Sequence, residues 1–310
     1  MVFIQGTWDI PTIAATIGQA LIDTDDFVDA DPDVTMGTVV KHTPTNTYVW
    51  ITPGVANSAS AQIHPYTLDA GMRVIFSSDW NTETHAPSGT IYRGHVNLYG
   101  NGAGSSDHQA SLSSITTPNA FPVSVCVDKY GFIGVIQNNY SDGNPSLFAC
   151  EFFPSVWMEY DDAQKPICFF TKHVYDAFYN NHVDTGQNLA NVDSGYHYIR
   201  PFNLAYGVTA NGNMGAYMPR EAYRSEGNNK TMFDFPWYQN DYASLKYPIA
   251  QTRRWFKISA TGGHAIGDII NWIDPDGTTV HKYIVAAADT TNLYAIPYQN
   301  AFDYAVSAKR

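Results

Sequence analysis

The feature that most constrains this chain is a succession of short β-favouring runs separated by turn-forming clusters, beginning at Val34. Turn-forming clusters such as Thr43–Asn46 and Pro53-Gly54 separate these runs, as expected between strands. A hairpin is predicted where the last two runs of the first half flank the turn at 141–145. The strand candidates are Thr38–Val40, Tyr48–Ile51, Met72–Phe76, Ile91–Leu98, Val123–Val127, Phe132–Gln137 and Leu147–Phe153. Such runs pair into sheets whose apolar faces are buried against another layer, which predicts a mainly β fold of antiparallel sandwich or barrel-like modules.

The C-terminal part repeats this pattern and predicts a β-meander. Turn signals lie at Asp274–Gly277 and Asp289–Asn292. The four strand candidates are Trp255–Ser259, Asp268–Ile273, Val280–Ala286 and Leu293–Ile296.

One helix is predicted near the beginning of the chain. Its apolar side chains recur at helical spacing, at Ile10, Ile13, Ala14, Ile17 and Leu21. Asp9 is suited to the N-cap and Pro11 to the first turn, and the helix should end near Asp23. Its apolar face must dock either on the rest of the chain or on a neighbouring subunit.

An acidic segment, Asp23–Asp33, follows the helix. Asp29–Asp33 resembles the opening of a calcium-binding loop, but Val34 and Val40 stand where glycine and glutamate are required. We therefore expect a solvated linker. The predicted organisation is an N-terminal helix with an acidic linker over 1–33 and a β-rich domain over 34–160.

Two further regions complete the predicted organisation, with the boundary at the polar break Asp161–Pro166. A loop-rich aromatic region is predicted over 161–250 and the meander over 251–310. Within the aromatic region, Val174–Phe178 could form a short helix, and Tyr196–Tyr223 is expected to form long packed loops and irregular strands.

Composition excludes several classes of protein. Only 15% of the 310 residues are charged and the formal net charge is −12, which argues against sequence-independent binding of nucleic acid. No signal peptide and no apolar stretch of membrane-spanning length are recognised, so membrane insertion is not expected. The three cysteines form no CxxC pair, and Cys126 and Cys150 are expected to be buried free thiols.

No catalytic motif is found. Nucleophile elbows and phosphate-binding loops are absent from the sequence. Although there are ten histidines, none forms the tight pair typical of zinc sites; the nearest grouping is His173, His182 and His197. We therefore assign no catalytic, cofactor-binding or metal-binding residue, and expect a protein that is not an enzyme.

A carbohydrate site is the alternative considered. Glycoside cleavage needs two carboxylates, and the best local cluster is Glu151, Glu159, Asp161 and Asp162. A solvated edge beside a strand is the preferred interpretation of that cluster. Trp80, Trp237 and Tyr238, if exposed, could stack on sugars, but packing in a subunit interface is preferred because the chain carries little charge.

Several segments resemble uncharacterised virion proteins of tailed bacteriophages and prophages. The resemblance extends over about half of the chain, but the matching segments are short and scattered, total 35 of the 310 residues, and carry no chemical signature. They are Phe76–Asn81, His85–Tyr92, Leu98–Gly100, Val127–Phe132, Gly267–Ile270, Asp274–Gly277 and Lys282–Val285.

This resemblance implies a non-catalytic structural subunit of a phage particle, in the tail tip, the baseplate or the fibre-attachment region. The implied partners are other virion proteins in a symmetric homo-oligomer or ring, without cofactor, nucleic acid or membrane. The implied location is the tail region of the virion, after synthesis in the host cytoplasm. A host-surface carbohydrate-binding or carbohydrate-cleaving protein, with a glycan as partner, is the alternative function.

Overall fold

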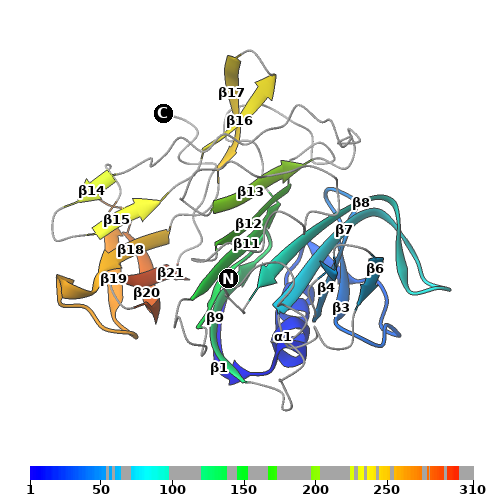
Figure 1. The fold of residues 1–310 in the computed structure, drawn as a ribbon, viewed down its shortest axis with the longest axis horizontal. Coiled ribbons are helices and arrows are strands. Elements are labelled where there is room, and N and C mark those ends of the chain that lie inside the picture. Colours follow the sequence, from blue (N-terminus) through cyan, green and yellow to red (C-terminus); the bar gives the residue numbers. More distant parts are fainter. Residues whose placement is uncertain are drawn as a thin grey trace.

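The computed structural model describes the chain in segments separated by gaps. Side chains are described for a smaller set, which includes 1–53, 72–89 and 120–137. The backbone is described for 1–53, 56–57, 60–63, 71–97, 120–137, 145–152, 167–172, 197–202, 224–226, 230–233, 236–241, 244–251, 255–273, 278, 280–289 and 292–299. The fold of these described residues is mainly β, as predicted, with three antiparallel sheets of five or six strands and one short α-helix (Figure 1).

The N-terminal sheet has five strands in the order β2-β3-β4-β7-β8. Its strands are β2 (Phe27–Asp29), β3 (Thr38–His42), β4 (Thr47–Pro53), β7 (Gly71–Asn81) and β8 (Ala86–Asn97). The predicted runs at Thr38–Val40, Tyr48–Ile51 and Met72–Phe76 therefore belong to strands, as does the described part of the run Ile91–Leu98, up to Asn97. The predicted turn at 43–46 joins β3 to β4.

The central sheet has six strands in the order β1-β9-β10-β11-β12-β13. These are β1 (Val2–Trp8), β9 (Phe121–Asp128), β10 (Gly131–Ile136), β11 (Ser146–Phe152), β12 (Ile167–Lys172) and β13 (His197–Phe202). The predicted β10–β11 hairpin is confirmed, with Val135 opposite Leu147. Strand β1 was not predicted. Strand β13 pairs regularly with β12, inside a region expected to form long packed loops and irregular strands.

The C-terminal sheet has six strands in the order β14-β15-β18-β21-β20-β19. These are β14 (Arg224–Glu226), β15 (Lys230–Phe233), β18 (Trp255–Ser259), β19 (Ile269–Ile273), β20 (Val280–Ala288) and β21 (Asn292–Gln299). A single turn of 3-10 helix, η4 (Ala260–Gly262), follows β18. The predicted meander is confirmed for β19, β20 and β21, whereas β18 pairs with β21 rather than with its neighbour in sequence, β19.

Two separate hairpins complete the described strands. One pairs β5 (Ala56–Asn57) with β6 (Ser60–Ile63), and the other pairs β16 (Pro236–Asp241) with β17 (Ser244–Gln251). The polar break Asp161–Pro166 and the short helix suggested at Val174–Phe178 lie outside the described residues.

Helix α1 (Ile10–Ile22) has the predicted boundaries and cap. The Asp9 carboxylate accepts a 2.9 Å hydrogen bond from the Thr12 backbone N–H, which satisfies one of the free donors of the first turn. All five predicted core positions are buried. The helix docks on the chain itself, since it contacts strands of both the N-terminal and the central sheet.

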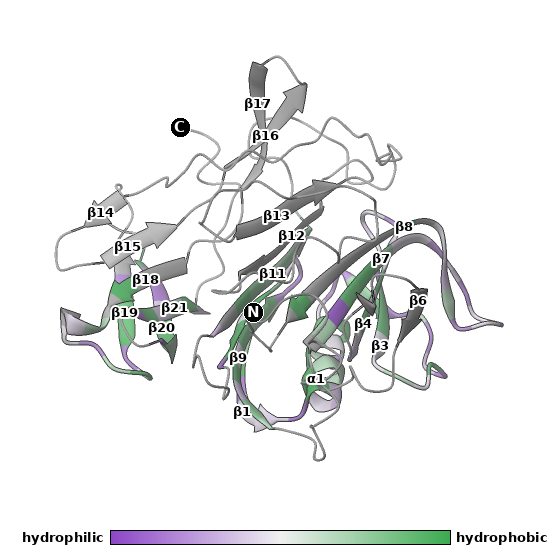
Figure 2. Ribbon diagram, in the orientation of Figure 1, coloured by the Kyte–Doolittle hydropathy of each residue, from purple (hydrophilic) through white to green (hydrophobic). Residues whose placement is uncertain are grey.

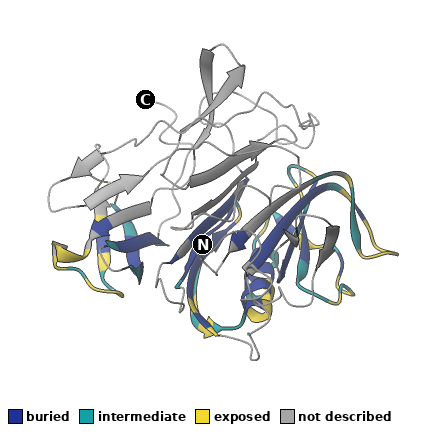
Figure 3. Cartoon of the chain, in the orientation of Figure 1, coloured by how far each residue is buried: buried dark blue, intermediate teal, exposed yellow. Residues whose placement is uncertain are grey.

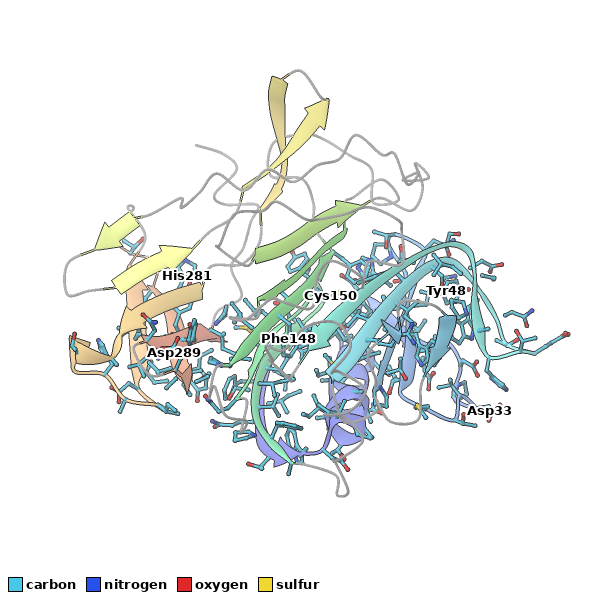
Figure 4. The ribbon with its side chains drawn as sticks, in the orientation of Figure 1. Asp33, Tyr48, Phe148, Cys150, His281 and Asp289 are labelled. Carbon is cyan, nitrogen blue, oxygen red and sulfur yellow. The ribbon has the colours of Figure 1, made fainter. Side chains whose placement is uncertain are left out.

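One hydrophobic core joins the helix to these two sheets. It contains Ile13 and Ile17 of α1, and also side chains of β2, β3, β4, β7 and β8 and of β9, β10 and β11. Figure 2 shows this green interior, and Figure 4 labels Phe148 and Cys150 of β11 within it. Cys126 and Cys150 are buried, as predicted.

The middle strands β9 and β10 of the central sheet are buried on both of their faces, apart from Pro122. Along β9, Val123, Val125 and Val127 face the helix core, yet Ser124 and Cys126 between them are buried too (Figure 3). The second face meets the C-terminal sheet, because β9 and β10 contact β21. The sheet thus forms the middle layer between the other two (Figure 1).

Two side-chain contacts connect the central and C-terminal sheets. The Gln137 amide donates to the Ala288 carbonyl at 2.9 Å and accepts from the Ala288 N–H at 3.0 Å. Phe3 of β1 packs edge-on against Tyr298 of β21, with ring centroids 5.0 Å apart.

The acidic segment after the helix is not the solvated linker that was expected. Phe27–Asp29 forms strand β2, which pairs with β3, and Phe27 enters the core. Asp31 is buried as well. The apolar Phe27 at the start of the segment outweighs the acidic composition of its neighbours, because burying a phenylalanine contributes about 1.5–3 kcal/mol.

No helix in the described parts of the chain is both long enough and apolar enough to span a membrane.

Candidate functional site

A buried carboxylate, Asp31, links the loop after β2 to the β7–β8 hairpin. Its Oδ2 atom accepts hydrogen bonds from the indole Nε1 of Trp80 and from Nδ1 of His85, both at 2.8 Å. The Asp31 side chain is 3% exposed, whereas that of His85 is 40% exposed. We call these three residues the Asp31 cluster.

The β7–β8 hairpin places His85 beside Asp31. At the end of β7, the Asn81 side chain accepts from the backbone N–H groups of Glu83 and Thr84, which tightens the turn. His85 closes this turn with a φ of +50°, a left-handed conformation that is uncommon for a residue with a side chain. The hydrogen bond to Asp31 provides a compensating contact for that conformation.

The loop that carries Asp31 is held at both ends. The Asp31 N–H donates to the Asp29 carboxylate at 3.1 Å, next to strand β2. Farther along, the Met36 carbonyl accepts a 2.8 Å hydrogen bond from the indole of Trp50 on β4. Trp50 packs edge-on against Trp80, with ring centroids 5.6 Å apart, so the two tryptophans fasten the loop to one end of the N-terminal sheet.

Opposing effects act on the ionisation of Asp31. Burial raises its pKa, while the hydrogen bonds from His85 and Trp80 and the proximity of the His85 ring lower it; the net result is a pKa below the ordinary value. Asp31 is therefore a carboxylate at neutral pH, and its charge is matched by donors from the β7–β8 hairpin.

The chemistry open to this cluster is limited by its contacts. A carboxylate that binds one nitrogen of an imidazole fixes the tautomer of the ring and leaves the other nitrogen for proton transfer or for a metal. Within the described residues, no hydroxyl or thiol contacts the His85 ring, and no three metal-ligating side chains come together. What the geometry does show is a link between segments that lie 49 and 54 residues apart in sequence.

The structure changes the interpretation of one predicted aromatic residue. Trp80 is buried and uses its indole N–H within the protein, so it is not the exposed platform for a sugar that was considered. For Trp237 and Tyr238, on β16, the side chains lie outside the described set.

The other candidates are mostly outside the described residues. Glu151 belongs to β11 without a described side chain, and Glu159, Asp161 and Asp162 lie beyond the described backbone. Of the histidines singled out, His197 begins β13, and His173 and His182 lie in an undescribed segment. The side chains of the predicted carboxylate cluster therefore all lie outside the described residues.

Several buried polar residues were missed by reasoning from sequence, Arg73 and Tyr294 among them. Arg73 of β7 is 1% exposed and lies opposite Thr52, although its run Met72–Phe76 had been recognised only as a strand. On β21, the Tyr294 hydroxyl donates to the Asp289 carboxylate at 2.6 Å. Burial, together with that hydrogen bond and the nearby charge, raises the pKa of Tyr294 far above its ordinary value, so this phenol stays neutral.

Comparison with family models, with curated proteins and with solved structures gave no match to this chain.

Proposed function

We propose that this protein is a non-catalytic structural subunit of a tailed-phage particle, in the tail tip, the baseplate or the fibre-attachment region. The observation that carries the proposal is where the phage-like segments lie. Phe76–Asn81 is in the N-terminal sheet, Val127–Phe132 spans the β9–β10 turn of the central sheet, and Lys282–Val285 is on β20 of the C-terminal sheet. The resemblance thus falls on the framework of all three sheets.

The polar contacts support the same proposal. Asp31, Trp80 and His85 use their hydrogen bonds to hold a loop against a hairpin, and Gln137 uses its amide to hold two sheets together. Buried polar groups that are fully engaged in this way add rigidity and uniqueness to a fold. Rigidity suits a subunit of a particle, because each subunit fixes the positions of its neighbours in the assembly.

Immunogold electron microscopy tests this proposal. Antibody against the recombinant protein, applied to particles from the source culture, should label one end of the tail, and antibody first absorbed with the protein should not. Unlabelled particles with free antigen in the lysate would count against a structural role.

The carbohydrate alternative has lost part of its basis, because Trp80 is buried. Saturable binding to a host glycan that is abolished by Trp237→Ala, combined with unlabelled particles, would favour that alternative over the structural one.

A further inference from the structure

Strand β1 forms one edge of the central sheet and lacks the features that usually protect such edges. Exposed edges are typically short, or carry charges or proline, because an unpaired strand edge can pair with another chain. The seven residues of β1, Val2–Trp8, include no charge and no proline. Among the described strands, β9 alone pairs with it.

Other sheet edges in the same protein are protected. The opposite edge of the central sheet, β13, contains Arg200 and Pro201. Strand β2 has only three residues and ends in Asp29, and β14 has three residues of which two are charged. The uncharged edge strand β19 is shorter than β1 and is flanked in sequence by Asp268 and Asp274.

The side chains of β1 are only partly covered within one molecule. Val2, Gln5 and Thr7 are exposed, while the other four residues of the strand are half-buried (Figure 3). Ile4 and Trp8 pack against the helix core, and Phe3 packs on Tyr298. A strand added beside β1 would therefore extend two packed faces that already exist.

The sequence of β1 fits a second copy of itself. When two antiparallel strands are related by a two-fold axis perpendicular to the sheet, the residue on the axis faces itself and both faces keep their character. With Gln5 on the axis, Ile4 lies opposite the small Gly6, Val2 opposite Trp8, and Phe3 opposite Thr7. Each bulky residue of the first two pairs extends the helix-core face, and a branched residue opposite an aromatic one is a favourable cross-strand pair.

The distribution of charge also favours a second copy of the chain as the partner of β1. The chain carries a formal net charge of −12, so two copies repel each other over most of their surfaces. Strand β1 is a seven-residue stretch where they can meet without placing like charges face to face. The two central sheets would then form one continuous sheet.

We propose that two copies of this protein pair through their β1 strands, antiparallel and with Gln5 opposite Gln5, about a two-fold axis perpendicular to the central sheet. The biological meaning of this dimer rests on the proposed assembly role, but its test requires only the purified protein.

Disulfide trapping tests the register directly. Opposed residues of antiparallel strands have Cα atoms about 4.5–5.5 Å apart, within the range that a disulfide spans. Under mild oxidation, Gln5→Cys should give a cross-linked dimer. Val28→Cys is the matched control, since Val28 is 44% exposed on the edge strand β2. The wild-type protein in the same oxidant controls for its three cysteines.

Sedimentation provides an independent readout. The wild-type protein should sediment as a dimer, and Gln5→Lys, which places two ammonium groups on the axis, should sediment as a monomer with an unchanged circular dichroism spectrum. Val28→Lys should remain dimeric. A monomeric wild-type protein, or a dimer that Gln5→Lys leaves intact, would overturn the proposal. Tail labelling by immunogold without any Gln5→Cys cross-link would overturn the β1 pairing and leave the assembly role standing.

Discussion

Asp31 connects the loop after β2 to the β7–β8 hairpin at one end of the N-terminal sheet. Its carboxylate is buried and accepts from two side chains that come from the far end of a long hairpin. A charge-assisted hydrogen bond contributes about 1.5–3 kcal/mol, and a buried donor that loses its partner costs a comparable amount. The Trp80 indole is such a donor, because it is buried with the carboxylate.

Asp31→Ala should therefore lower the free energy of unfolding by about 3 kcal/mol, because Trp80 and His85 both lose their acceptor. Urea unfolding followed by tryptophan fluorescence measures this change. Asp25→Ala is the control, since Asp25 is exposed in the same acidic segment, and it should change stability by less than about 0.5 kcal/mol. Equal effects of the two variants would show that the cluster does not stabilise the fold.

The ionisation of Asp31 also predicts a dependence on pH. Because the pKa of Asp31 is lower in the folded state, its stabilising effect is fully present above the pKa of an unfolded aspartate, about 3.9, and is lost as the pH falls through the folded value. Unfolding midpoints measured from pH 6 down to acid should show a smaller acid-induced loss for Asp31→Asn than for the wild type. Parallel curves would contradict the assignment.

At the scale of elements, the approach of helix α1 to strand β3 is set by a glycine. A Cβ atom added at Gly18 would lie 2.3 Å from the Cβ of Thr38, far inside van der Waals contact. Glycine is a poor helix former, so its place in the middle of α1 reflects packing rather than helix propensity.

Gly18→Ala is expected to destabilise the protein, although alanine is favoured over glycine in a helix by about 1 kcal/mol. Overpacking typically costs about 1–3 kcal/mol, and relief here requires the helix to move away from the sheet. Thr16→Ala, on a half-buried position of the same helix, should be neutral or stabilising. Thermal unfolding of both variants checks this, and a Tm raised by Gly18→Ala would refute the packing argument.

The elements differ in how far the sequence predicts them. Helix α1 was predicted completely, because its cap and apolar spacing are local. Strand β1 was missed because Gln5-Gly6-Thr7 interrupts its apolar alternation, and β2 because three residues among aspartates give a weak signal. The Asp31 cluster was missed because its members come together only through the successive pairing of β2, β3, β4 and β7, which no local pattern specifies.

For the whole molecule, the central sheet couples the other two layers. It contributes one wall to the helix core, and its second face lies against the C-terminal sheet. The C-terminal sheet has a smaller core of its own, which includes Ile258, Tyr283 and Val285. Its attachment to the central sheet should therefore depend on individual contacts such as those of Gln137.

Gln137→Ala should lower stability by about 1–3 kcal/mol, because two hydrogen bonds to the Ala288 backbone are lost. The loss of protection in hydrogen exchange should be greatest in β20 and β21. Gln19→Ala, which removes an exposed hydrogen bond to Asp23 on the helix, is the control and should leave those strands protected. Uniform loss of protection across all three sheets would show that Gln137 has no special role in holding the C-terminal sheet.

The pairing of β1 with β9 determines when the central sheet can form during synthesis of the chain. Val2 lies opposite Val127, so the first strand waits for more than a hundred further residues before its neighbour exists. At a synthesis rate of about 5–20 residues per second, this delay lasts roughly 6–25 s. During this delay, the apolar face of α1 cannot yet pack against strands β9, β10 and β11 of the central sheet. Early intermediates on the ribosome should therefore bind chaperones until strand β9 emerges, and refolding of the released chain should be slow because its decisive contact is so distant in sequence.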